Sequence, residues 1–383
     1  MRRREDLVDV WSRDLSRRRS NRHTGMLARL RGVIQGASRA RCHGFIGGGV
    51  RRWLCPPGGV ANRLVCGMAT SAPEASTPTV TDPAVGLAGD RAAVRLARKA
   101  AGFVALTKPR IIELLLVTTL PTMVVADKGV PRVALMFWTL VGGTLAAGGA
   151  NAINMWVDRD IDAIMKRTEK RPLVTGILQP TEALVFAIGL EILAFAVLAW
   201  AANLLSAVLA VSATAFYVFV YTLWLKRRSR QNIVIGGAAG AVPVLVGWSA
   251  VTGSLSWAPL VLFAVIFVWT PPHFWALAVK YRDDYAAANI PMMPVVADPK
   301  STGRQIVAYS VVLWATSLVF SPVAGMGLIY DVAATGLGAV FLLFAIRVLR
   351  SPTITNSMRL FGWSITYLTL LFGAMTLDQL VLR

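Results

Sequence analysis

The chain has 383 residues, of which 55% are hydrophobic and only 16% are charged, and its mean hydropathy is +0.56. A soluble domain of this length needs more charge on its surface, so the composition predicts an integral membrane protein and excludes an ordinary water-soluble one. The net charge of +20 is divided between the N-terminus and short loops instead of forming one stripe, which argues against nucleic-acid binding.

The first 100 residues contain no long apolar run and are rich in Arg, Ser, Gly, Pro and Ala. We therefore expect a basic, disordered extension over residues 1–100 and a transmembrane domain over residues 101–383. The extension has two interpretations: a leader for the mitochondrial inner membrane, or part of a bacterial plasma-membrane protein whose translation starts near Met68. We favour the bacterial interpretation because four acids fall within the first fourteen residues. Residues 91–110 are basic and amphipathic and are expected to lead into the membrane.

Cysteine and histidine are nearly missing from the apolar body of the chain. All three cysteines lie within residues 1–67, and His273 is the only histidine after residue 100. The sequence therefore predicts no disulfide framework, zinc site or Cys/His nucleophile in the transmembrane domain.

Nine apolar stretches follow, each close to the ~20 residues that a membrane-spanning helix needs. Because unpaired backbone groups cannot be left in hydrocarbon, these stretches predict an all-α, polytopic fold. We expect two pseudo-repeated four-helix halves and a terminal helix. The predicted spans are 108–126, 132–152, 180–200, 204–225, 233–251, 257–277, 305–324, 328–346 and 361–381.

The loops between these spans differ in charge. The loops that follow the even-numbered spans carry sixteen Lys and Arg residues, whereas those on the other side carry only Lys128 and Arg132. Positive loops remain on the cytoplasmic side, so we expect a cytoplasmic N-terminus and a C-terminus on the opposite side.

Acidic side chains gather where the second span reaches the positive side. Asn154, Asp158 and Asp162 are four residues apart, so on a helix they share one face, whereas Asp160 points away. Oxygen ligands arranged in this way can hold Mg²⁺ together with diphosphate oxygens. Four cations follow and can neutralise a departing diphosphate: Lys166, on the same stripe, and Arg167, Lys170 and Arg171. The alternative, a solvated loop beside the membrane, explains these cations but not the acids beside an apolar helix.

Two further polar clusters are expected on the same side of the membrane. Asp283 and Asp284 follow the sixth span, so a second acidic helix end is expected to meet the first. Residues 226–232 are basic and lie between the two in sequence. They fit either phosphate contact, through Lys226 and Arg227, or a purely topogenic role.

These residues resemble the intramembrane aspartate-rich, UbiA-type prenyltransferase superfamily, and within it most closely the branch that farnesylates heme. The resemblance covers about residues 100–381, and residues 1–90 lie outside it. The stretches that carry it are LTKPRIIELLL at 106–116, NMWVDRDIDAIMKRTEKRPLVTG at 154–176, NIVIGGAAGAVPVLVGW at 232–248 and TPPHFWALAVKYRDDYAAANIPMMPVV at 270–296.

The resemblance implies transfer of a farnesyl group from farnesyl diphosphate to a vinyl group of protoheme IX, with hydration. It implies Mg²⁺ as the cofactor, and as partners the two substrates, the lipid bilayer and the enzyme that next modifies the heme, but no nucleic acid. The implied metal ligands are Asn154, Asp158, Asp162 and Asp284. The implied catalytic groups are Asp158, Asp162, Lys166 and Arg167, and the implied substrate contacts are Arg110, Asn154, Arg171, Lys226, Arg227, His273 and Tyr281.

One position departs from the superfamily pattern. The second motif usually has two aspartates four residues apart, but Ala288 occupies that spacing from Asp284, which puts the second metal site in doubt. Two of the substrate contacts have equally simple alternatives: His273 as a hydrogen-bonded residue at a helix break after Pro271-Pro272, and Arg110 as an interfacial anchor.

Two other functions remain open from the sequence. A related enzyme that prenylates a quinone-ring precursor would keep the first acidic motif but should lack the block at 270–296. A transporter would place its polar residues near the membrane midplane, whereas these acids lie at helix ends on one side.

Overall fold

The computed structural model describes residues 83–381, with side chains for 93–109 and 117–381, and these residues are helical with no strand. The first long helix, α2, covers Pro83–Thr107, so the boundary expected at residue 100 falls inside it. Residues 83–100 of the extension predicted to be disordered are helical, and residues 1–82 lie outside the described residues.

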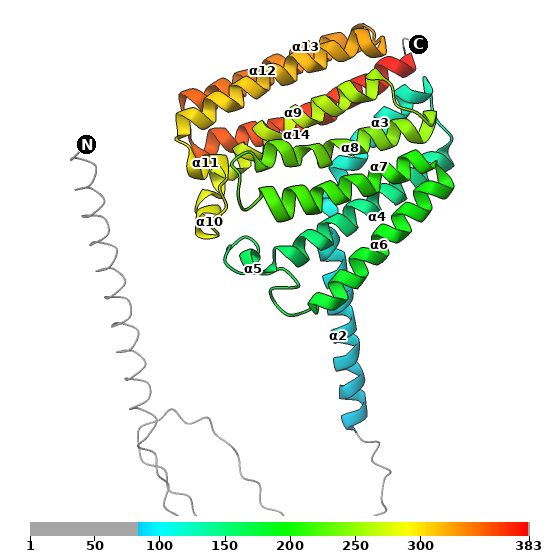
Figure 1. Ribbon diagram of the computed structural model, residues 1–383, viewed down its shortest axis with the longest axis vertical. Helices are drawn as coiled ribbons and strands as arrows, with labels where there is room; N and C mark the ends of the chain where they lie inside the picture. Colours follow the sequence, from blue (N-terminus) through cyan, green and yellow to red (C-terminus); the bar gives the residue numbers. More distant parts are fainter. Residues whose placement is uncertain (1–82, 382–383) are drawn as a thin grey trace, which may run out of the picture. The chain divides into compact units, whose positions relative to one another are not determined.

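Nine long helices follow α2 and coincide with the nine predicted spans, with α7 and η1 forming one span (Figure 1). They are α3 (Pro109–Asp127), α4 (Val133–Val157), α6 (Pro180–Ala201), α7 (Leu204–Ala215) with η1 (Phe216–Leu225), α8 (Asn232–Thr252), α9 (Trp257–Lys280), α12 (Pro299–Ala324), α13 (Leu328–Arg350) and α14 (Ile354–Val381). Within the described residues, eight of them, all but α3, are long and apolar enough to cross a membrane. The predicted all-α, polytopic fold is confirmed.

Three short helices lie in the connections: α5 (Arg159–Asp162), α10 (Arg282–Ala287) and α11 (Met293–Val296). Figure 1 shows α5 and α10 at the same end of the bundle, where α4 and α9 terminate. The two acidic segments therefore meet at one end, as the alternation of spans requires.

The helix ends follow local sequence signals. Gln179 and Glu182 form a reciprocal capping box at the start of α6. Asn203 and Asp298 accept backbone N–H groups at the starts of α7 and α12. The start of α13 is capped from another element, because buried Asp378 of α14 accepts hydrogen bonds from the backbone N–H groups of Gly327 and Tyr330, over 2.6 and 3.2 Å.

The packing divides the helices into two groups that α3 and α8 join. α4, α6 and α7 pack on one another, as do α9, α12, α13 and α14. α3 contacts α4, α8 and α14, and α8 contacts α4, α7 and α9. Buried aromatic side chains fill the second group, among them Trp275, Tyr330 and Tyr367. Large apolar side chains on the outside, such as Val185 and Trp200, are 72% and 75% exposed, as expected of a lipid-facing surface.

The span that contains η1 changes its helical geometry half-way. Residues 204–215 are α-helical, but the next ten form a π-helix, in which Thr222 Oγ1 donates to the carbonyl of Tyr217 over 2.8 Å. π-Helical turns are frequent at functional sites. This one ends at Lys226, beside the acidic end of α4.

Candidate active site

The acidic cluster forms where α4 ends. α4 stops at Val157, Asp158 has φ −85° and ψ 4°, and α5 continues through Asp162. The helical hydrogen bonds nevertheless continue. The backbone N–H of Asp158 donates to the carbonyl of Asn154, and that of Asp162 donates to the carbonyl of Asp158, both over 2.9 Å. Asp158 and Asp162 are consequently buried (0% and 1% exposed), while Asp160 is exposed, as the helical spacing predicts.

Each of these two carboxylates is in direct contact with one cation. Lys226 contacts Oδ2 of Asp158, and Arg171 contacts Oδ2 of Asp162. Such pairing is required, because an isolated buried carboxylate is very costly. The second oxygen of each carboxylate, Oδ1, is buried and accepts no hydrogen bond within the described part of the chain.

These two free oxygens fit a divalent cation. Mg²⁺ is usually bound through one or two carboxylates, with substrate phosphates and water completing its coordination. No group of three or more His, Cys, Asp and Glu side chains that could hold a metal occurs among the described residues. A metal here would therefore rely on Asp158, Asp162 and oxygens supplied by the substrate.

Asn154 lies between the carboxylates and two residues that the sequence did not single out. Its amide nitrogen donates to Asp158 Oδ2 over 2.7 Å and to Thr222 Oγ1 over 3.2 Å. Its oxygen accepts from Lys108 Nζ over 3.1 Å.

Lys108 was missed because sequence analysis of Thr107-Lys-Pro-Arg singled out Arg110 instead. The sequence feature that could have identified Lys108 is a cation directly before Pro109, at the start of an apolar run. The side chain of Arg110 lies outside the described residues, so its proposed contact stays a prediction.

The second acidic segment is linked to the first through the loop after α5. The backbone N–H of Arg167 donates to Asp284 Oδ2 over 3.3 Å, and its guanidinium donates to the hydroxyl of Tyr285 over 3.3 Å. That guanidinium also lies over the ring of Tyr281, 5.1 Å from its centroid. The structure thus brings Asp284, Arg167 and Tyr281 together, but it shows no contact between Asp284 and Asp158 or Asp162.

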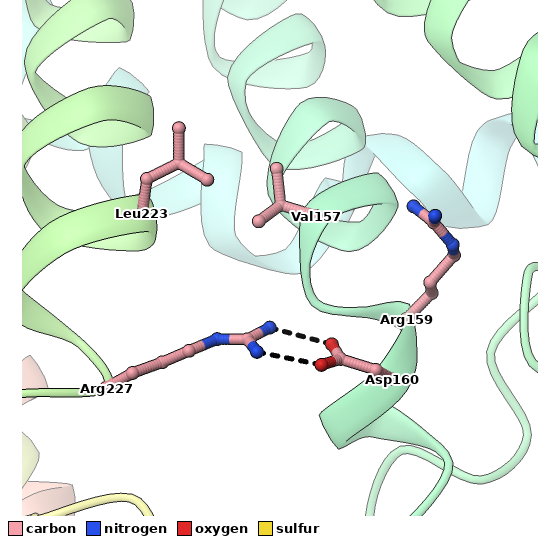
Figure 2. A pocket seen from close by; sticks show the side chains of 5 residues that line it. All are labelled: Val157, Arg159, Asp160, Leu223 and Arg227. Atoms are coloured by element: carbon pink, nitrogen blue, oxygen red, sulfur yellow. Dashed lines mark hydrogen bonds and ion pairs between the residues drawn. The ribbon is translucent and has the colours of Figure 1, made fainter.

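Lys166 is not placed as the sequence predicted, whereas Arg227 lies beside Asp160 and Asp158. The predicted stripe through Lys166 is wrong, because α5 ends at Asp162 and Lys166 is exposed on the following turn. Arg227 donates two 2.7 Å hydrogen bonds to Asp160, which lower the pKa of that carboxyl, and its Nη2 is 3.9 Å from Asp158 Oδ1. Figure 2 shows this pair across a pocket of about 430 Å³ that Val157 and Leu223 also line.

His273 is packed inside the bundle. Its ring stacks against Trp269 and Phe361, with centroids 4.2 and 4.6 Å away, and its Nδ1 lies 2.7 Å from Ser364 Oγ. The helix break expected at Pro271-Pro272 is wrong, since α9 continues through both prolines. This environment favours the hydrogen-bonded structural alternative over a contact with a charged substrate group.

Two tyrosines of η1 extend the site toward the bundle interior. The rings of Tyr217 and Tyr221 stack with centroids 5.3 Å apart. A methyl group at Gly236 of α8 would collide with the ring of Tyr221, so this glycine lets α8 approach η1 closely. The tyrosines, like Thr222, had no signal in the sequence beyond their place in an apolar span.

An all-helical bundle with buried carboxylates and cations at one end is the architecture of an intramembrane prenyltransferase. The chain matches the UbiA prenyltransferase family over residues 115–372 and belongs to that family. It is therefore an integral membrane prenyltransferase.

Similar proteins and solved structures are consistent with this family and fold. The chain is 53% identical to the protoheme IX farnesyltransferase of Clavibacter sepedonicus, over 76% of this chain and 96% of that one. It is 55% identical to the protoheme IX farnesyltransferase of Frankia casuarinae, over 75% of this chain and 100% of that one. The apo structure of a UbiA homolog from Aeropyrum pernix K1 shares the fold, with a TM-score of 0.56 and 21% identity over 70% of this chain and 98% of that one.

Proposed function

We propose that this chain transfers the farnesyl group of farnesyl diphosphate to a vinyl group of protoheme IX, with addition of water, to give heme O and diphosphate. The single observation that carries the proposal is the identity of more than 50% to proteins named protoheme IX farnesyltransferase across nearly their whole length. The pair of buried carboxylates with free oxygens supports the chemistry.

The reaction begins when the allylic C–O bond breaks and the diphosphate leaves with the bonding electrons. The terminal vinyl carbon then forms a C–C bond to the farnesyl cation, and water adds to the carbon left electron-deficient and releases a proton. Mg²⁺, held by Asp158 and Asp162, would supply Lewis-acid stabilisation of the leaving diphosphate. Asn154, placed by Lys108 and Thr222, orients Asp158 for this role.

The cations would stabilise the leaving group. We assign this role to Lys226 and Arg171, which are largely buried at the site, and to Arg227, whose guanidinium lies 3.9 Å from Asp158. Arg167 and Tyr281 would contact the substrate from the second acidic segment, with Asp284 as a further metal ligand. The apolar bundle interior excludes water from the allylic cation until the C–C bond has formed.

The site would face the cytoplasm of a bacterial cell. The excess of basic residues in the loops on this side supports that orientation, and the bacterial relatives support the plasma membrane. Labelling of a cysteine introduced at Ser229 by a membrane-impermeant reagent should occur in inverted vesicles and not in intact cells.

The test uses the purified full chain with farnesyl diphosphate and Mg²⁺, and either protoheme or 4-hydroxybenzoate as acceptor. We expect a product with the mass of protoheme plus a farnesyl group and a hydroxyl group, which disappears when EDTA removes the metal. A farnesylated 4-hydroxybenzoate with unmodified protoheme would instead assign the chain to quinone-precursor chemistry.

A further inference from the structure

Cations of the protein contact the groups that would bind a divalent metal, although one oxygen of each carboxylate stays free. Lys226 and Arg171 each contact one oxygen of a buried carboxylate, and Lys108 donates to Asn154 Oδ1 over 3.1 Å. An ammonium group can only donate and a carboxylate can only accept, so Asn154 must turn its oxygen toward Lys108 and its nitrogen toward Asp158. In this arrangement the amide oxygen is not free to bind a metal.

The backbone of Lys108 is strained in a way that brings its side chain to this site. Lys108 has φ 53° and ψ 63°, a left-handed conformation that is unfavourable for residues other than glycine and that a following proline restricts further. Packing of the α2–α3 joint on α4 holds it there. Asn151 Nδ2 donates to the carbonyl of Thr107 over 3.2 Å, and Gly148 admits the Thr107 side chain. Strain that the surrounding structure maintains is a feature of functional sites.

The formal charges of the cluster disfavour the binding of a metal ion without diphosphate. Asp158 and Asp162 face Lys108, Lys226 and Arg171, and the charge of nearby Arg227 is matched by Asp160, so the site has one more positive than negative charge. A divalent cation alone would increase this excess. A divalent cation that arrives with a diphosphate, which carries about three negative charges, would cancel it.

We propose that Lys108, with Lys226, makes metal binding and diphosphate binding depend on each other. The ammonium group of Lys108 occupies the oxygen of Asn154, and that of Lys226 contacts the Asp158 carboxylate whose other oxygen is free for a metal. Both charges repel a metal ion that arrives alone, and both can pair with a diphosphate that arrives with it. Lys108 is thus a positioning residue that acts through Asn154. The inference rests on the proposed function only in taking this cluster as the metal and diphosphate site.

Mutual dependence has a thermodynamic signature. If diphosphate raises the affinity for the metal by some factor, the metal raises the affinity for diphosphate by the same factor. Removal of the Lys108 charge should relieve the repulsion of the metal, strengthen metal binding alone and reduce this factor.

The experiment titrates Mn²⁺, as a paramagnetic substitute for Mg²⁺, into the detergent-purified full chain and measures free Mn²⁺ by EPR. Each titration is run with and without inorganic diphosphate, against a protein-free titration that corrects for the Mn²⁺–diphosphate complex. For Lys108→Met we expect Mn²⁺ alone to bind about tenfold more tightly than in wild type, and the enhancement by diphosphate to fall by a similar factor.

Three variants make the test specific. Lys99→Met removes the same kind of charge from α2, where Lys99 pairs with Glu182 at 2.6 Å, and should leave both titrations unchanged. Lys108→Arg keeps the charge and should retain the coupling. Lys226→Met should repeat the effect of Lys108→Met, and it replaces that variant if Lys108→Met does not fold.

The proposal is overturned if a folded Lys108→Met or Lys226→Met protein binds Mn²⁺ alone no more tightly than wild type, or if the enhancement by diphosphate is unchanged. These titrations involve no heme. A failure of protoheme to act as acceptor would therefore overturn the proposed function and leave this result standing.

Discussion

Asp158 and Asp162 differ from Asp160 by position on one helical turn, and the structure separates them by burial. The first two are 0% and 1% exposed, with one free oxygen each, whereas the side chain of Asp160 is 59% exposed. We expect Asp158→Asn and Asp162→Asn each to lower the farnesyl transfer rate by about 10²–10³, as for loss of one transition-state stabiliser. Single-turnover rates with saturating farnesyl diphosphate and Mg²⁺ measure this loss.

Asp160→Asn is the matched control. Its exposed ion pair with Arg227 is worth only about 0.2–1 kcal/mol, so its rate should fall far less. Equal sensitivity of Asp160 and Asp158 would contradict the assignment of the metal site to the buried face. Melting temperatures of all three variants separate a loss of chemistry from a loss of folding.

At the scale of elements, the contact between α8 and η1 sets the position of the tyrosines beside the acidic cluster. Gly236 touches the ring of Tyr221, whereas nothing lies within 4 Å of a methyl group placed at Gly240, one turn later on the same helix. We expect Gly236→Ala to destabilise the protein by about 1–3 kcal/mol through overpacking and to lower activity. Thermal unfolding in detergent, together with the transfer assay, measures both effects.

Gly240→Ala provides the comparison within α8. Alanine is the better helix former, by about 1 kcal/mol, so this variant should be as stable as wild type or more stable. A Gly236→Ala variant that behaves like Gly240→Ala would show that Tyr221 can move aside without cost, and that the close approach of α8 does not fix η1.

At the scale of the whole molecule, the polar clusters assigned to the site all come from residues 101–383, the predicted transmembrane domain. Deletion of residues 1–67 should therefore leave membrane insertion and farnesyl transfer at wild-type levels. Membrane fractionation and the transfer assay on the truncated chain test this expectation. A truncated protein that inserts correctly but is inactive would contradict the interpretation of this segment as a dispensable extension.

The sequence by itself determined the membrane class and the separation of Asp158 and Asp162 from Asp160. It also placed nine long helices of the described residues, eight of which are apolar enough to span a membrane. These features follow from local rules: hydrophobic length sets a span, and a spacing of four residues sets a helical face. The N-terminal ends of α6, α7 and α12 also follow from local sequence, because each is capped by a residue that directly precedes the helix.

Only the tertiary structure decided which groups meet the carboxylates. Lys108 reaches Asn154 from 46 residues away, and Lys226 reaches Asp158 from 68 residues away, so no local pattern relates them. The same holds for Arg227, which pairs with the exposed Asp160, and for His273, which is enclosed by rings from α9 and α14. The predicted stripe through Lys166 failed because a helical register applies only while the helix continues, and the chain turns after Asp162 to bring Arg167 to Asp284 and Arg171 back to Asp162.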